Sequence, residues 1–306
     1  MKVFDLHCDT LTKCFDDRIS FSKKGRTHIS LDNSMLFEKW VQCFAVFIDD
    51  VYKGKDATEY FRRVAAYWQN EVLADRNIKK LQQFSDIDAD DKSCKAILTV
   101  ENGSMLGGKI ENMSLLDEFG VRLFSLTWNG ENEIAGGVLS EQGLTDFGKK
   151  VVSSLEEKNI VLDVSHLNDK SFYEVCENAT KPFVASHSNA RSVCHMLRNL
   201  KDDQLKIIFD GGGVVGINFY PKFIERYKSK DYFDDIYAHI EHMLSLGGEN
   251  SIALGSDFDG ADMEDKMPNQ EYLFRLYEYL LSRNIDEKII NKIYYDNAYS
   301  FFKKIL

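Results

Sequence analysis

The first apolar stretch of the chain ends in a histidine and an aspartate two residues apart, in the segment "FDLHCD" at residues 4–9. Successive side chains of a β-strand point to opposite faces, so His7 and Asp9 are predicted on one face and Cys8 on the other. Imidazole and carboxylate groups together suit Zn²⁺ and related divalent ions. Taken alone, however, a His-x-Asp pair is more often an ordinary strand end that runs into a polar turn.

Four further ligand-type side chains follow other apolar runs. They are Glu101 in "ILTVENG", His166 in "LDVSHL", His187 in "FVASHSNAR" and Asp257 in "ALGSDFDG". Each has an ordinary interpretation by itself, as a helix-start or turn residue. A metal site explains all six placements at once. Because three imidazoles and three carboxylates exceed what one tetrahedral ion needs, two ions that share a carboxylate are predicted.

The elements that must position these side chains are short β-branched runs, which alternate with longer helical patterns. The eight runs are residues 3–6, 42–48, 96–100, 121–126, 160–164, 183–185, 213–217 and 252–254. Runs that are apolar on both faces are typical of parallel strands covered by helices. Amphipathic helices are predicted at 146–159, 169–178, 202–210 and 231–246, with two more between 270 and the end. This order predicts an α/β fold, a single (β/α)8 TIM-type barrel, with a doubly wound open sheet as the alternative.

The loops that follow the strands of such a barrel gather at one face, where catalytic groups sit. The six ligand-type residues are therefore predicted at the barrel mouth. Residues 10–40 are long for a connection between a strand and a helix, and we expect a lid or an extra helix there; the helices near the end of the chain are extra as well. Because no linker-like segment interrupts the sequence, residues 1–306 are predicted to form one domain.

Composition narrows the class of partner. The formal net charge of −11 argues against nucleic acid and against an anionic membrane surface, both of which attract basic patches. No apolar stretch has the length of a membrane span, and the first residues lack a signal-peptide pattern. The six cysteines are scattered without Cys-x-x-Cys pairs, as expected for free thiols, so a cytoplasmic location is predicted.

Several long segments resemble the membrane (renal-type) dipeptidase family of zinc peptidases, which belongs to the amidohydrolase superfamily. In chain order they are "DLHCDT", "VENG", "GLTDFGKKVVSSLEEKNIVLDVSHL", "ASHSNARSVCHMLRNL", "GGVVGINFYPKFI" and "IALGSDFDG". The resemblance extends from residue 4 to about residue 260. It implies a (β/α)8 barrel that carries a binuclear zinc site.

The resemblance also implies a role for each residue that matches a family motif. The implied zinc ligands are His7 and Asp9 on the first ion, Glu101 as the bridge, and His166 and His187 on the second ion. Asp257 would be the acid–base residue beside the bridging water. Arg198, in "MLRNL", matches the arginine that holds the carboxylate of the substrate.

One position departs from the family pattern. Trp128, in "SLTWNGEN", stands where renal-type members carry a substrate-facing histidine that stabilises the tetrahedral intermediate. A wall residue packed at the barrel rim is an equally open interpretation of Trp128. If it lines the pocket, its indole N–H or the neighbouring Asn129 could donate to the oxyanion.

The function expected from the resemblance is hydrolysis of dipeptides, including those with a C-terminal D-residue, by a hydroxide held between two zinc ions. Other divalent metals are expected to substitute for zinc, and a homodimer is compatible with the sequence. Two alternatives remain open: another amidohydrolase, such as an N-acyl amino acid deacylase, and a catalytically silent metal-binding barrel that serves as an interaction module.

Overall fold

Parallel strands close into a barrel in the computed structural model, which describes residues 1–21, 25–31, 36–81, 83–89, 91–227, 229–263 and 266–305. Within these residues, the 8 barrel strands lie in the order β2-β1-β9-β8-β7-β6-β5-β4, and the pairing of β4 with β2 closes the ring. They are β1 Lys2–Asp5, β2 Lys39–Phe47, β4 Cys94–Glu101, β5 Val121–Ser125, β6 Val161–Asp163, β7 Val184–Ala185, β8 Val214–Ile217 and β9 Ile252–Leu254. The closed ring confirms the predicted TIM-type barrel and rules out the open doubly wound sheet.

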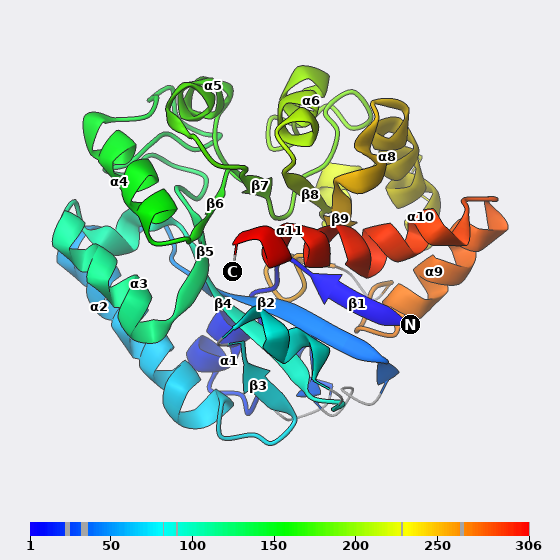
Figure 1. Cartoon of the computed structure of the whole chain (residues 1–306), viewed down its shortest axis with the longest axis horizontal. Coiled ribbons are helices and arrows are strands. Elements are labelled where there is room, and N and C mark those ends of the chain that lie inside the picture. Colours follow the sequence, from blue (N-terminus) through cyan, green and yellow to red (C-terminus); the bar gives the residue numbers. More distant parts are fainter. Residues whose placement is uncertain are drawn as a thin grey trace.

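Helices surround the strands, as Figure 1 shows. Their bounds are α1 Thr10–Asp17, α2 Gly54–Tyr67, α3 Ser114–Phe119, α4 Asp146–Glu157, α5 Asp169–Asn178, α6 Asp202–Asp210, α7 Pro221–Ile224, α8 Phe233–Ser245, α9 Tyr272–Ser282, α10 Glu287–Asn291 and α11 Asn297–Ile305. Side-chain caps set two of the predicted starts: Thr145 accepts from the backbone N–H of Gly148 before α4, and Asn168 accepts from that of Ser171 before α5.

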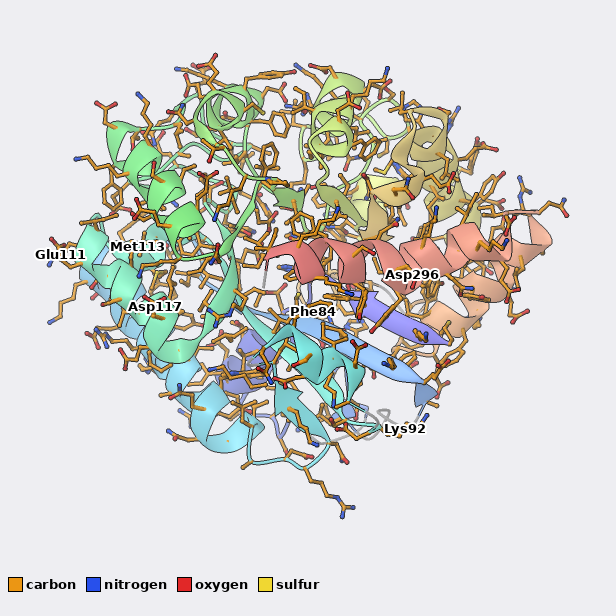
Figure 2. All side chains as sticks on the ribbon, in the orientation of Figure 1. Phe84, Lys92, Glu111, Met113, Asp117 and Asp296 are labelled. Carbon is orange, nitrogen blue, oxygen red and sulfur yellow. The ribbon has the colours of Figure 1, made fainter. Side chains whose placement is uncertain are left out.

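The amino-terminal end of the barrel is filled by apolar side chains. Every barrel strand contributes to this cluster: Phe4, Val41, Ile97, Leu123, Val161, Val184, Val214 and Ala253. The last helical segment covers them, because Phe301 and Phe302 pack into the same cluster and α11 crosses in front of the strands in Figure 1. Phe84 lies at this end too (Figure 2), with its ring 4.8 Å from that of Tyr299. A packed amino-terminal end leaves the opposite face for a site.

Several sequence predictions need correction in detail. The second strand begins at Lys39, earlier than residue 42, since its pairing with β1 starts there. The helix predicted at 231–246 begins at Phe233, because Tyr232 before it adopts a left-handed φ of 62°. A short strand, β3 Ile78–Lys80, pairs parallel with β4 outside the ring, and it was not predicted, nor was α2.

The long connection at residues 10–40 contains the expected extra helix, α1. Residues 22–24 and 32–35 of that connection lie outside the described residues, so the lid stays a prediction. Among the described residues, no helix combines the length and the hydropathy that a bilayer crossing requires.

Candidate metal centre

The six predicted site residues lie together at the carboxyl end of the barrel. They come from five different strand ends, and each is between 1% and 8% exposed. Imidazole and carboxylate atoms approach closely: His7 Nε2 is 3.1 Å from Asp9 Oδ2, 3.4 Å from Glu101 Oε2 and 3.9 Å from Asp257 Oδ1. The predicted common face of His7 and Asp9 is therefore confirmed, and Cys8 points elsewhere, with its thiol directed at the backbone oxygen of Cys43.

Glu101 lies between two groups of imidazoles. Its Oε1 is 2.8 Å from His166 Nε2 and 3.7 Å from His187 Nε2, while its Oε2 faces His7. The two imidazoles also approach each other, with Nε2 of His166 and Nε2 of His187 only 2.9 Å apart. Three overlapping sets have their ligand atoms within 4.8 Å of one another: His7, Asp9 and Glu101; Glu101, His166 and His187; His7, His187 and Asp257.

The backbone is bent to bring these groups together. His166 and Asp257 both adopt left-handed conformations, with φ of 71° and 62°. Such conformations cost a non-glycine residue about 1–3 kcal/mol and persist only where the surroundings impose them. Gly260 closes the turn after Asp257, and a Cβ there would lie 2.0 Å from Asp9 Oδ2 and 2.5 Å from Asp257 Oδ1. A glycine is thus required for the turn to approach the acidic groups.

Burial and mutual repulsion raise the pKa values of two of the carboxyl groups. Burial, followed by the charge of Asp9, raises the pKa of Glu101 to about 8. Burial likewise raises the pKa of Asp257 to about 6, with Asp9 contributing and His7 opposing. The cluster therefore holds carboxylates that the protein alone does not fully stabilise in their charged form.

The pKa values of the three histidines are shifted in different directions. Burial lowers the pKa of His166 and of His187 well below the usual value, so both imidazoles are neutral and able to bind a metal. For His7, burial acts to lower the pKa, but the carboxylates of Asp9 and Glu101 outweigh it and the pKa is raised well above the usual value.

The donor set fits divalent cations. Asp9 Oδ1 is buried without a hydrogen-bond partner, which is costly for a carboxylate oxygen unless something positive binds it. Neutral imidazoles and carboxylates form the mixed nitrogen and oxygen set that zinc accepts. Cations at this place would also favour the ionised forms of Glu101 and Asp257, whose burial otherwise opposes charge.

A cavity of about 520 Å³ opens onto the cluster. Asp9, Glu101, His166 and Asp257 form part of its lining, and Phe47, Trp128, Tyr220 and Phe223 give it aromatic walls. Trp128 is half-buried and packs edge to face on Phe47, with ring centroids 5.0 Å apart. A larger hollow of about 780 Å³ lies between α1 and α2, but none of the cluster residues lines it.

Arg198 is buried beside the site rather than in the cavity lining. Its guanidinium donates to Ser188 Oγ and to the backbone oxygen of His187, both at 2.9 Å, and lies 5.8 Å from the ring centre of Phe223. The Nε–H of Arg198 is buried without a partner and could donate to an incoming acceptor.

Two contacts at the site were not predicted from the sequence. Asn218, which follows β8 in "GINFY", donates through Nδ2 to Asp257 Oδ2 at 2.9 Å. Its place at a strand end was a usable signal, but an amide is a weak indication of a metal site. Asn129, predicted as an oxyanion donor, has its amide oxygen 3.1 Å from His166 Nδ1 and so orients that imidazole; the oxyanion role stays a prediction.

Several known proteins are similar to this chain in sequence. A family model described as membrane dipeptidase (peptidase family M19) matches residues 1–305. An uncharacterized protein encoded in the pqqA 5′ region of Klebsiella pneumoniae is 32% identical over 227 residues, an alignment that covers 71% of this chain and 84% of that protein. An uncharacterized dipeptidase of Schizosaccharomyces pombe is 33% identical over 148 residues, which cover 46% of this chain but 36% of that protein.

Solved structures share the fold over the whole chain. A metallopeptidase from Rhodobacter sphaeroides, liganded with a phosphinate mimic of the dipeptide L-Ala-D-Ala, superposes with a TM-score of 0.92 at 24% identity and covers 100% of this chain and 99% of its own. An amidohydrolase from Pseudomonas aeruginosa gives a TM-score of 0.81 at 19% identity, covering 99% of this chain and 96% of its own. At these identities the superpositions show a common fold. The match to the family model over nearly the full length shows more: the chain belongs to the membrane dipeptidase family, peptidase family M19.

Proposed function

We propose that this chain is a metallo-dipeptidase that hydrolyses the peptide bond of dipeptides with a free C-terminus and works with two zinc ions. The observation that carries the proposal is the position of Glu101, whose two carboxylate oxygens face different imidazoles, His7 on one side and His166 on the other. A carboxylate so placed is suited to bridge two cations. Membership of the dipeptidase family supports the reaction class.

His7, Asp9 and Glu101 would hold one ion, and Glu101, His166 and His187 the other. When bound, two such ions lower the pKa of a coordinated water and polarise the scissile carbonyl. Zinc suits the mixed nitrogen and oxygen donors, and cobalt or manganese is expected to substitute.

Asp257 is the proposed proton carrier. Asn218 holds its Oδ2, while its Oδ1 faces the cluster 3.9 Å from His7 Nε2. From there the carboxylate accepts the proton that the attacking water loses as its oxygen bonds to the carbonyl carbon. It returns that proton to the amine nitrogen as the C–N bond breaks, so that one water is consumed and two amino acids leave.

Arg198 is the proposed anchor for the substrate carboxylate. Its buried charge and unpartnered Nε–H match an anionic acceptor, and paired hydrogen bonds from a guanidinium would select substrates with a free C-terminus. The liganded Rhodobacter relative binds a mimic of L-Ala-D-Ala, which supports the inclusion of dipeptides with a C-terminal D-residue.

Replacement of Arg198 by alanine should raise KM strongly for dipeptides, because it removes one partner of a charged and largely desolvated pair. Such a loss is commonly worth about 2–5 kcal/mol, which corresponds to a tens-fold or larger increase. Amidation of the dipeptide C-terminus should impair the wild-type protein in the same way, and the two losses should not add, since either change removes one contact. The measurement is kcat/KM for both proteins on free and amidated dipeptides.

N-acyl amino acids belong in the same substrate panel. Efficient cleavage of N-acyl amino acids with little dipeptide turnover would favour the deacylase. Cleavage of an amidated dipeptide as fast as that of the free acid would defeat the carboxylate anchor. A metal-loaded protein that cleaves neither class would point to the silent barrel.

For Trp128 the structure favours a wall residue. We expect Trp128→His to lower the melting temperature without raising kcat, because it removes an edge-to-face aromatic contact with Phe47 that is worth about 0.5–1.5 kcal/mol. Trp128→Phe, which keeps an aromatic ring at this place, is the matched control and should lose less stability. A clear gain in kcat for Trp128→His would show instead that tryptophan replaces a catalytic donor.

A further inference from the structure

A buried carboxylate is connected to His187 by two hydrogen bonds, through the hydroxyl of Ser186. Asp163, the last residue of β6, is fully buried and accepts four hydrogen bonds. Its Oδ1 accepts from the backbone N–H groups of Ser165 and Ser186, both at 2.9 Å. Its Oδ2 accepts from the hydroxyls of Ser125 at 2.5 Å and Ser186 at 2.6 Å. All four lone-pair directions of the carboxylate are thus used by donors.

The second contact of Ser186 reaches the metal centre. Its Oγ lies 2.7 Å from Nδ1 of His187. A hydroxyl has one proton, and the Ser186 proton lies on the bond to Asp163, because two oxygens 2.6 Å apart need a proton between them. Ser186 Oγ can therefore only accept from His187, which places the imidazole proton on Nδ1 and leaves the Nε2 lone pair facing Glu101 and His166.

We propose that Asp163 and Ser186 are positioning residues that fix the tautomer of His187 for metal binding. This inference rests on the proposed metal site and extends it beyond the ligands themselves. Residues behind a metal ligand commonly orient a ligating imidazole through its second nitrogen. Asn129 has the same role toward His166, because its amide oxygen faces Nδ1 of that imidazole. Both imidazoles then direct their Nε2 lone pairs toward Glu101 and toward each other across 2.9 Å, which is where a cation would bind.

The substitution Asp163→Asn should reverse the direction of the hydrogen bonds that run from Asp163 through Ser186 to His187. The two backbone N–H groups cannot rotate, so they keep the amide oxygen of the new side chain at the place of Oδ1. The amide NH₂ then occupies the place of Oδ2 and donates to the serine hydroxyls. Ser186 then turns its proton toward another acceptor, and His187 Nδ1 at 2.7 Å is nearer than Ser165 Oγ at 3.3 Å. Donation to Nδ1 moves the imidazole proton to Nε2 and blocks the metal-binding atom.

The chain provides a matched pair of variants. Ser125 and Ser186 are both buried and donate to the same oxygen of Asp163, but only Ser186 contacts His187. Ser186→Ala should weaken zinc binding about 10–100-fold, measured by competition with a chromophoric chelator. Ser125→Ala should keep zinc affinity close to wild type, and Asp163→Asn should lose more affinity than Ser186→Ala. Melting temperatures of the metal-free proteins show whether each variant folds.

A spectroscopic signature separates tautomer control from general damage. Nitrogen-15 NMR of the side chain of His187 in the metal-free protein should show the proton on Nδ1 in wild type and on Nε2 in Asp163→Asn. Equal zinc affinities for Ser186→Ala and Ser125→Ala, or an unchanged tautomer in Asp163→Asn, would overturn the inference while leaving the metal site intact. A wild-type protein that binds no zinc would instead overturn the proposed function.

Discussion

Protein stripped of metal by a chelator should hydrolyse no dipeptide, and activity should return when zinc, cobalt or manganese is added. The reason is chemical. Free water has a pKa of about 15.7 and is a poor nucleophile at neutral pH, and a bound divalent ion lowers that value to about 7. Cys8 is not an alternative nucleophile, because burial raises the pKa of its thiol well above the usual value and the thiol faces the backbone oxygen of Cys43. Metal analysis of active protein should give about two equivalents per chain.

Metal return should also stabilise the fold. A ligand that binds only the folded state at a concentration about 100 times its dissociation constant adds about 2.7 kcal/mol, so the melting temperature should rise with added zinc. Glu101→Gln serves as the control, since a neutral amide bridges two cations poorly and this response should shrink. Full activity in thoroughly metal-free protein would end the hydrolytic mechanism proposed here.

The ligand-type residues could be found from sequence because barrel geometry makes strand ends converge. His7, Glu101, His166, His187 and Asp257 each follow an apolar run, and the runs identify themselves by their β-branched composition. Parallel closure then brings side chains from distant positions to one face. The prediction needed no knowledge of individual contacts. Strand β3, by contrast, has the sequence Ile78-Lys79-Lys80 and so lacks the apolar run that marks the other strands.

Contacts behind the ligands could not be read in the same way. Ser186 adjoins His187 in sequence, but its partner Asp163 lies 23 positions away and meets it only because β6 pairs with β7. Serine is so common in turns that "ASHS" alone does not identify a hydrogen-bonded chain. Asn129 illustrates the same limit, because the direction of its amide toward His166 depends on the loop after β5. The predicted cytoplasmic location and homodimer remain predictions, since they concern surroundings rather than the fold.

Asp257→Asn should keep both metals yet lose most turnover, because it removes proton transfer while preserving shape. General acid–base groups contribute about 10²–10⁴-fold to rate, so kcat should fall by that range with little change in KM. The turn should survive, since asparagine tolerates the left-handed φ of 62° and its amide oxygen can still accept from Asn218.

The measurement is kcat together with metal content, and Glu101→Gln is the comparison that should lose metal. The opposite outcome is structurally feasible, because ligand atoms of Asp257, His7 and His187 lie within 4.8 Å of one another and could hold one metal ion together. Equal metal loss in the two variants would mean that Asp257 is a ligand, and proton transfer would then have to be assigned to another group.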